Sequence, residues 1–208
     1  MLDQTTLITY LAILLGFVFL PGPATILTLA RATSSGTRVG LATGLGIAAG
    51  DVLHTAMTVL GLAAVIATSA LLFNVIKYVG AAYLLYLGIR AILEKPQNAL
   101  DLGLPRLGPS QAFRQAVLAE VLNPKTAMFF LAFLPQFVRP ENGSAALQLT
   151  TLGLLLVAMG LLSTVTVALG AGWVGDFLRR HPAVLRWQGK VVGGIYVALG
   201  ARLALQER

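Results

Sequence analysis

Cysteine is absent from this chain of 208 residues, and charged residues are scarce. Without cysteine, the protein can form no disulfide, no thiolate metal site and no thiol relay. Charged residues make up 11% of the sequence, against about a quarter in an ordinary soluble domain. With eight acidic residues and two histidines, few side chains could build a metal centre or an acid–base active site. We therefore expect no cofactor and no bound metal, and we do not expect an enzyme.

Hydrophobic residues dominate instead, at 57% of the sequence and a mean hydropathy of +0.82. This composition predicts an all-α, polytopic membrane helix bundle. At about 20 residues per span, five to seven spans fit, so residues 1–208 are expected to form one transmembrane domain. The net charge of +7 comes from basic residues that flank apolar segments. It therefore indicates orientation in a lipid bilayer and not nucleic-acid binding.

Six apolar segments are long enough to cross a bilayer. They are residues 6–29, 40–69, 71–93, 113–137, 146–172 and 187–205. Only Thr68 and Ser69 separate the second segment from the third, which is the weakest of these boundaries. Because the N-terminus lacks the basic region of a cleaved signal peptide, we expect the first segment to be retained as a span.

Lysine and arginine are distributed unevenly over the two sides of this arrangement. The loops after the first, third and fifth segments contain Arg31, Arg38, Arg90, Lys95, Arg106, Arg114, Arg179, Arg180, Arg186 and Lys190. The opposite side has Lys77, Arg139, Arg202 and Arg208. Because basic loops stay in the cytoplasm, we expect the first group inside and both termini outside.

Two of the apolar segments contain helix breakers. Pro21-Gly22-Pro23 interrupts the first segment and Asn123-Pro124-Lys125 the fourth. Proline removes a backbone donor and costs about 3 kcal/mol in a helix interior. In hydrocarbon, such a break persists only where it is buried in protein or lines a cavity. Breaks at corresponding positions of two halves point to the binding site of a transporter.

An internal repeat gives the breaks corresponding positions. The pattern K-x-V-G-x-x-Y begins at Lys77 in the third segment and at Lys190 in the sixth, and P-x-T begins at Pro23 and at Pro124. We predict a first repeat over residues 1–94, a linker over 95–112 and a second repeat over 113–208. With three spans each, the two repeats would be inverted. The alternative is chance similarity between helices rich in glycine and leucine.

Two charges fall near the middle of the predicted spans. Asp51 lies about 17 Å and Lys125 about 18 Å from the cytoplasmic face, at 1.5 Å per residue. A charge at this depth marks a functional site by default. Their similar depth would allow an ion pair, so a purely structural pairing of Asp51 with Lys125 is the alternative.

Three further residues accompany these charges. Glu120 lies about 10 Å deep, and it is predicted either to contribute to the site or to cap a helix or pair with Arg114 at the membrane surface. His54 follows Asp51 by three residues on the same helix face, and a polar helix contact is favoured over proton transfer. Gly50 ends a series of glycines that recur four residues apart, which favours close helix packing.

A broken helix presents free amide donors and the positive end of its dipole, which suit a carboxylate. A nearby acidic side chain suits an ammonium group. Together these features predict a site for a zwitterion, namely a small amino acid. Few acids lie in the spans, so a neutral amino acid is favoured over a dibasic one, although Glu120 could supply the extra carboxylate.

The same segments resemble the LysE/RhtB family of amino-acid exporters. The motifs are P-G-P at Pro21, G-I-A-A-G-D ending at Asp51, G-A-A-Y-L-L-Y-L-G from Gly80, and L-N-P-K-T-A-M-F-F from Leu122. The resemblance implies a multi-pass protein of the bacterial inner membrane that exports an amino acid or a derivative, driven by the proton gradient. Family members handle lysine, arginine, homoserine and its lactone, threonine or leucine. The resemblance also implies which residues lie along the substrate pathway: the motif glycines and prolines, Asp51, Asn123 and Lys125.

Other functions remain open at this stage. An exporter of divalent metal ions would have Asp51, Glu120 and His54 as its only ligands within the spans. A membrane-embedded enzyme would need a catalytic cluster that the sequence lacks, and a passive channel would not need a broken helix. The glycine series leaves open whether close contacts form within one chain or in a homo-oligomer.

Overall fold

The computed structural model describes residues 2–19, 22–68, 70–93 and 105–205. Within these ranges every regular element is helical, which confirms the predicted all-α bundle. Pro21 of the first break, Ser69 and most of the predicted linker lie outside the described residues. The division into two repeats and a linker stays a prediction.

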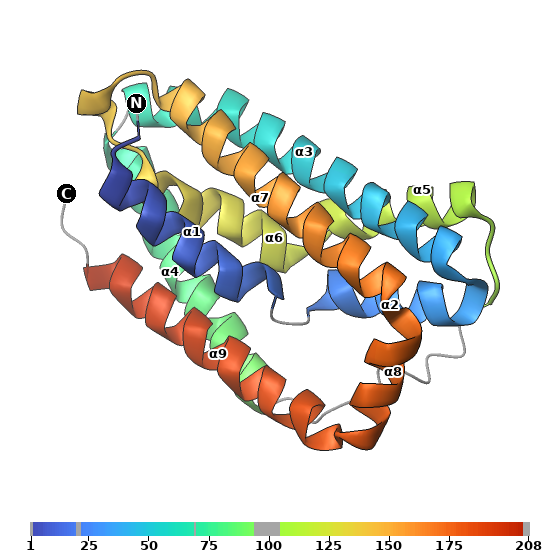
Figure 1. Cartoon of the computed structure of the whole chain (residues 1–208). Helices are drawn as coiled ribbons and strands as arrows, with labels where there is room; N and C mark the ends of the chain where they lie inside the picture. The colour runs from blue at the N-terminus through green and yellow to red at the C-terminus, as the bar shows by residue number, and fades with distance from the viewer. Residues whose placement is uncertain (1, 20–21, 69, 94–104, 206–208) are drawn as a thin grey trace.

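Four helices form the first part of the bundle (Figure 1). They are α1 (Gln4–Phe19), α2 (Pro23–Ser35), α3 (Thr37–Thr68) and α4 (Ala70–Leu93). The first predicted span is thus two helices, and they meet at an angle of 46°. Pro23 is the first residue of α2, where its missing N–H interrupts no helical hydrogen bond. The break therefore falls where the proline chemistry predicts it.

The second part begins with another broken span. Its elements are α5 (Pro109–Val121), α6 (Pro124–Met128), a π-helical turn η1 (Phe129–Phe133), a 3₁₀ turn η2 (Leu134–Phe137) and a 3₁₀ turn η3 (Pro140–Asn142). The segments before and after Asn123 meet at 45°. Beyond the second break the helix continues as irregular turns, which the sequence analysis did not predict.

Three helices complete the chain: α7 (Ala145–Leu169), α8 (Ala171–Arg180) and α9 (Pro182–Leu205). The predicted fifth span, 146–172, was too long at its end. Gly170 closes α7, and a separate ten-residue helix, α8, turns away from it. Exposed Trp173 and Phe177 stack on α8. Such amphipathic helices lie along a membrane surface.

Three of the described helices are long and apolar enough to cross a membrane, and five spans result if each bent pair counts as one. The predicted sixth span falls within α9, several of whose side chains lie outside the described residues. With 24 residues, α9 is about 36 Å long, enough for a bilayer core of about 30 Å. Six spans therefore stay a prediction.

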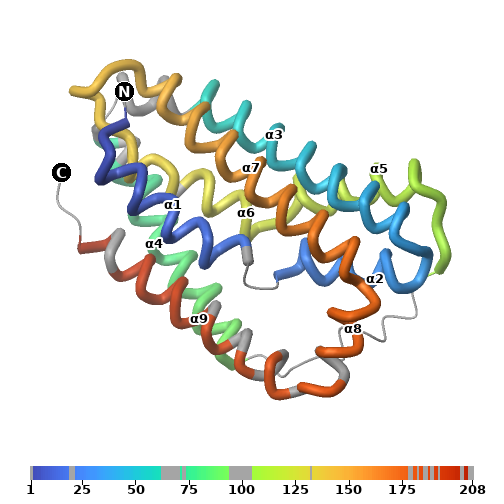
Figure 2. Tube along the Cα trace, viewed as in Figure 1, coloured from blue at the N-terminus to red at the C-terminus, as the bar shows by residue number. Residues whose placement is uncertain are grey.

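The helices pack closely along two seams. α3 lies against α5 and α7, and α4 runs beside α9 (Figures 1 and 2). Gly46 of α3 approaches α5 so closely that an added Cβ would lie 2.4 Å from the carbonyl oxygen of Phe113. Gly88 of α4 and Gly193 of α9 face one another in the same way. The glycine series thus serves helix packing within the chain.

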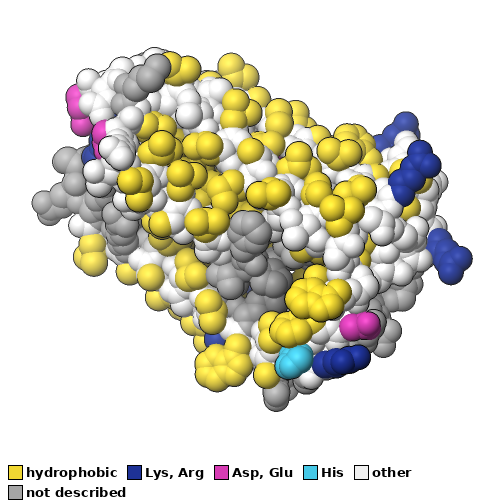
Figure 3. Space-filling model, in the orientation of Figure 1, with side chains coloured by type: hydrophobic (Ala, Val, Ile, Leu, Met, Phe, Trp, Pro, Cys, Tyr) yellow, Lys and Arg dark blue, Asp and Glu magenta, His cyan; other side chains and the backbone are white. Residues whose placement is uncertain are grey.

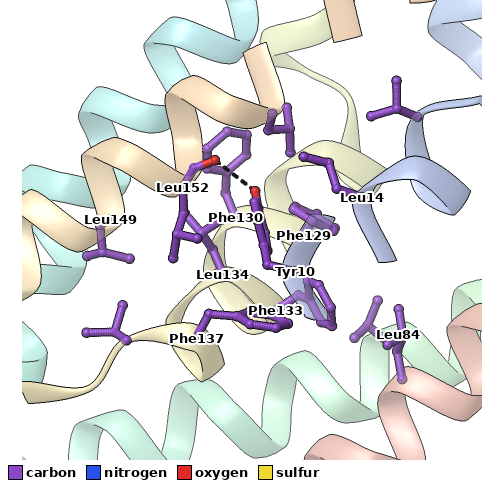
Figure 4. Close-up of a cluster of buried hydrophobic side chains, with 14 of the residues drawn as sticks. Tyr10, Leu14, Leu84, Phe129, Phe130, Phe133, Leu134, Phe137, Leu149 and Leu152 are labelled. Atoms are coloured by element: carbon purple, nitrogen blue, oxygen red, sulfur yellow. Dashed lines mark hydrogen bonds between the residues drawn. The ribbon is translucent and has the colours of Figure 1, made fainter. Parts of the chain in front are cut away.

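Aromatic residues form the centre of the larger hydrophobic core (Figure 4). Rings from η1 and η2 surround Tyr10 of α1, and the Tyr10 hydroxyl donates a 2.8 Å hydrogen bond to the main-chain oxygen of Leu152 on α7. This core ties α1 to the second part of the chain. Along α1, the core lies between the first residues of that helix and the break before Pro23.

The surface separates apolar sides from a basic end (Figure 3). Lysine and arginine gather at the end of the bundle where α2 ends and where α3 and α5 begin, which we call the basic end. Exposed Arg38 belongs to α3, and exposed Arg114 belongs to α5. α1 begins and α9 ends at the opposite end (Figure 1).

Candidate substrate site

A cavity lies where the two helix breaks meet. Its walls come from α1, α2, α3, α5, α6 and α7, and its volume is about 60 Å³. A single water needs about 10–15 Å³ of such space, so the cavity holds several waters or part of a small solute. The lining residues are Phe17, Val18, Gly22, Pro23, Ala24, Thr25, Ile47, Asp51, Glu120, Asn123, Lys125, Thr126, Leu156, Gly160, Ser163 and Thr164.

Asp51 of α3 supplies a carboxyl group with unused hydrogen-bonding capacity. The residue is 4% exposed, and its Oδ1 is buried without a hydrogen-bond partner in the described part of the chain. The other oxygen, Oδ2, would lie 3.5 Å from a Cβ added at Gly160 of α7. Because a buried polar atom is normally paired, the free oxygen indicates room for a donor from a bound solute.

Glu120 lies at the end of α5 and is bound by residues of the second break. Asn123 Nδ2 donates to both carboxylate oxygens, at 3.3 and 3.2 Å, and the Thr126 hydroxyl donates to Oε1. The residue is 4% exposed. The alternative of a surface pair with Arg114 is therefore wrong, since the carboxylate lies inside the bundle with two polar partners.

Lys125 reaches the cavity from the first turn of α6. Its main-chain N–H donates to Asn123 Oδ1 at 3.0 Å, which caps the helix. The ammonium group lies 4.3 Å from the ring centroid of Phe17 and 5.9 Å from that of Tyr196. It also interacts electrostatically with Glu120 and Asp51. In place of the direct ion pair that equal depth allowed, the ammonium packs on aromatic faces.

The first break leaves main-chain groups that need partners. Ser163 of α7 donates a 3.2 Å hydrogen bond to the main-chain oxygen of Val18, a carbonyl at the end of α1. On the other side of the break, α2 begins at the cavity with Gly22 as its N-cap, and no side chain caps it. The amides of Ala24 and Thr25 belong to the first turn, which has no helical acceptors. α2 thus points its positive end into the cavity.

The remaining predicted site residues lie beside the cavity. His54 Nε2 is 3.0 Å from the main-chain oxygen of Glu120, and the ring stacks on Phe130. Gly50 packs on Glu120, where an added Cβ would lie 2.7 Å from the Glu120 Cβ. Pro124 is exposed at the first position of α6. None of these three lines the cavity.

Sequence reasoning missed the contribution of α7. Gly160, Ser163 and Thr164 all line the cavity. Their spacing of three and four residues places them on one helix face, so a small, polar face within an apolar segment was the available signal. In the described ranges, no group of three or more His, Asp or Glu residues that could hold a metal ion occurs.

Residues 15–207 match the family model of the LysE type translocators. The chain belongs to this family. It is 31% identical to the uncharacterized membrane protein YrhP of Bacillus subtilis, over 96% of this chain and 99% of that protein. It is 29% identical to an uncharacterized membrane protein of Vibrio cholerae, over 98% of both chains. The leucine efflux protein of Salmonella choleraesuis is also 29% identical, over 94% of this chain and 93% of that protein.

No solved structure matches the chain significantly. Family membership and the apolar helices make the protein a multi-pass translocator of the bacterial inner membrane. The resemblance to the LysE/RhtB family that the motifs indicated is thus confirmed.

Proposed function

We propose that the protein exports a neutral amino acid, or a close derivative, in exchange for protons. The observation that supports this most is the cavity at the two breaks, where a free helix N-terminus and two buried carboxyl groups face one space. A zwitterion carries the complementary charges. The leucine efflux proteins among the relatives transport a solute of this class.

The carboxylate of the solute would bind at the start of α2. The amides of Ala24 and Thr25 offer two donors at the positive end of a 13-residue helix. Lys125 lines the same cavity. A carboxylate between these groups would receive charge-assisted hydrogen bonds, which are the stronger class.

The ammonium group of the solute would bind Asp51. The free Oδ1 of that residue needs a donor, whereas Glu120 already accepts hydrogen bonds from Asn123 and Thr126. Glu120 then acts as a fixed charge nearby and Asp51 as the direct ligand. With one carboxylate already paired, the site has no second acid for the side chain of a dibasic substrate.

Apolar residues complete the cavity. Phe17, Val18, Ile47 and Leu156 line it beside the polar groups. An aliphatic side chain placed against them would lose contact with water, at about 0.8 kcal/mol per buried CH₂ group. This favours leucine-like substrates over small polar ones such as homoserine.

Proton coupling is proposed to reside in the carboxyl pair. Asp51 and Glu120 are both buried and line the same cavity, and two carboxyl groups in one buried space favour holding a single proton between them. Among the described residues, Lys125 and Tyr10 also interact electrostatically with Asp51, and α7 contributes the uncharged residues Leu156, Gly160, Ser163 and Thr164 to the cavity. A substrate ammonium would replace the shared proton, so proton and substrate occupy the site in turn.

Two organisational proposals accompany this function. The broken spans bend by 46° and 45°, and close glycine contacts join α4 to α9, as expected for two inverted repeats. The basic end is proposed to face the cytoplasm, because lysine and arginine gather there. Substrate would then enter the cavity between α2 and α5.

An export assay in cells that express the protein tests the proposal. A panel of neutral, dibasic and acidic amino acids is loaded, and external accumulation is compared between the wild type, Asp51→Asn and Lys125→Ala. Glu141→Gln, at an exposed position of η3 outside the cavity, is the matched control. We expect export of leucine-like solutes, lost in both site variants and retained in the control. Flux of a divalent metal with no flux of any amino acid would favour the competing metal exporter.

A further inference from the structure

Arg31 is fully buried near the end of α2, at 2% exposure. Its Nη1 donates a 2.7 Å hydrogen bond to the main-chain oxygen of Pro105, and its Nη2 donates a 2.6 Å bond to Oε1 of Gln115. The third nitrogen, Nε, is buried without a partner in the described part of the chain. No step of the proposed substrate site uses this guanidinium group.

The partners of Arg31 join the two half-helices that reach the cavity. α2 begins at the cavity with Gly22 and ends at the basic end. α5 begins at the basic end, after Pro105, and ends at the cavity with Glu120. Next to Arg31, the main-chain N–H of Leu107 donates a 3.3 Å bond to Ser35 Oγ. One bond from Arg31 thus reaches α5, and two further bonds fasten α2 to the segment just before α5, all at the end away from the cavity.

We propose that Arg31 is a positioning residue that acts as a latch. It holds α2 against α5, closes the basic end of the cavity, and must release for a solute to enter from that side. The inference rests on the proposed transport function, because only a translocator needs this end to open. It does not depend on which solute is transported.

The chemistry of the group suits a latch that opens in every cycle. A guanidinium donates in several directions at once, so one side chain reaches a main-chain oxygen and a side-chain amide together. Both of these acceptors are neutral, and Nε has no partner among the residues that the structure describes. Incomplete pairing of a buried charge costs free energy. The closed arrangement is thus held less firmly than a fully paired one.

A second cross-connection lies on the other side of the cavity. Tyr10 of α1 donates a hydrogen bond to the main-chain oxygen of Leu152 on α7. Tyr10 lies about two helical turns before Phe17, the first residue of α1 that lines the cavity. Polar contacts therefore join the two parts of the chain on each side of the site. Alternating access requires that one side opens while the other stays closed, and Arg31 is the latch of the basic end.

The absence of cysteine provides a direct test. Ile47 lines the cavity and is 4% exposed, so Ile47→Cys introduces a single shielded thiol. A membrane-impermeant maleimide is added to inside-out vesicles and, separately, to intact cells. With Arg31→Gln in addition, we expect labelling about tenfold faster from the side of the basic end, because two hydrogen bonds to a charged group are lost. Labelling from the other side should not rise.

Arg38→Gln is the matched control, since it removes an exposed arginine at the same end and should leave the labelling rate unchanged. Arg31→Lys keeps the charge but not the two-directional geometry, and an intermediate rate is expected. If Arg31→Gln does not fold, Gln115→Leu removes one of the two acceptors at an exposed position and should give a smaller increase from the same side.

Two results would overturn the latch. One is an unchanged rate in folded Arg31→Gln and Gln115→Leu; the other is an equal rise from both sides, which indicates general loosening. The labelling requires no substrate. One-sided labelling without transport of any amino acid would therefore remove the proposed substrate and leave the latch in place.

Discussion

The hydroxyl group of Ser163 on α7 donates a 3.2 Å hydrogen bond to the main-chain oxygen of Val18 at the end of α1. The two residues are 145 positions apart. The bond supplies a donor to a buried carbonyl group at the break before Pro23. It also fixes α7 beside the cavity, so the break in one part of the chain depends on a helix of the other.

Ser163→Ala should therefore destabilise the protein. A buried carbonyl that loses its partner costs about 1–3 kcal/mol, which thermal unfolding in detergent can detect. Thr166→Ala is the control, because the Thr166 hydroxyl is exposed and bonds only to Leu162 of its own helix. An equal melting temperature for Ser163→Ala and Thr166→Ala would contradict the role given to Ser163.

Close packing of α3 on α5 makes a second prediction. Gly46→Ala would place a Cβ 2.4 Å from the carbonyl oxygen of Phe113, so the helices must separate, at about 1–3 kcal/mol. Gly61→Ala on the same helix meets nothing within 4 Å and should be neutral or stabilising, since alanine favours helix. Denaturation of the two variants in parallel measures the difference. A stability loss of the same size in both would remove the packing argument.

Lys125 is predicted to recognise the substrate carboxylate. Lys125→Gln should weaken binding of leucine by about 10- to 100-fold, the equivalent of one lost charge-assisted bond. Leucine amide lacks the carboxylate, so its inhibition of transport should change much less. Competition assays with both ligands, on the wild type and the variant, measure the interaction energy between Lys125 and the substrate carboxylate. Equal losses for leucine and its amide would place Lys125 outside carboxylate recognition.

The carboxyl pair predicts how pH acts on exchange. Protons compete with the substrate ammonium for Asp51, so leucine counterflow in the wild type should slow as pH falls. Any residual counterflow in Asp51→Asn should be independent of pH, because the titrating carboxyl is gone. Proteoliposome counterflow at several pH values, equal on both sides, measures this. An Asn variant that retains the wild-type pH profile would assign coupling to another group.

Local chemistry made part of this structure predictable. Pro23 and Pro124 each disrupt the helix at their own position, whatever surrounds them, so both breaks could be placed from the sequence. The depths of Asp51 and Lys125 follow from counting residues along a helix, and both residues line one cavity.

Contacts between distant segments were not predictable in this way. Ser163 and Gly160 form a small, polar helix face, but this pattern does not identify their partners, which belong to α1 and α3. The packing of the Lys125 ammonium on Phe17 depends on the angle at which α1 meets α6. The irregular turns after α6 place their phenylalanine rings in the core around Tyr10, a contact between distant segments that the sequence analysis did not predict.

Leucine efflux from proteoliposomes tests the central claim most directly. Vesicles are loaded with labelled leucine and diluted into acidic or matched buffer, with wild-type protein or Asp51→Asn. The account predicts that external acid accelerates efflux several-fold in the wild type, since inward proton movement drives export, and that the variant shows no acceleration. Efflux that ignores the proton gradient, or acceleration that survives in Asp51→Asn, would contradict it.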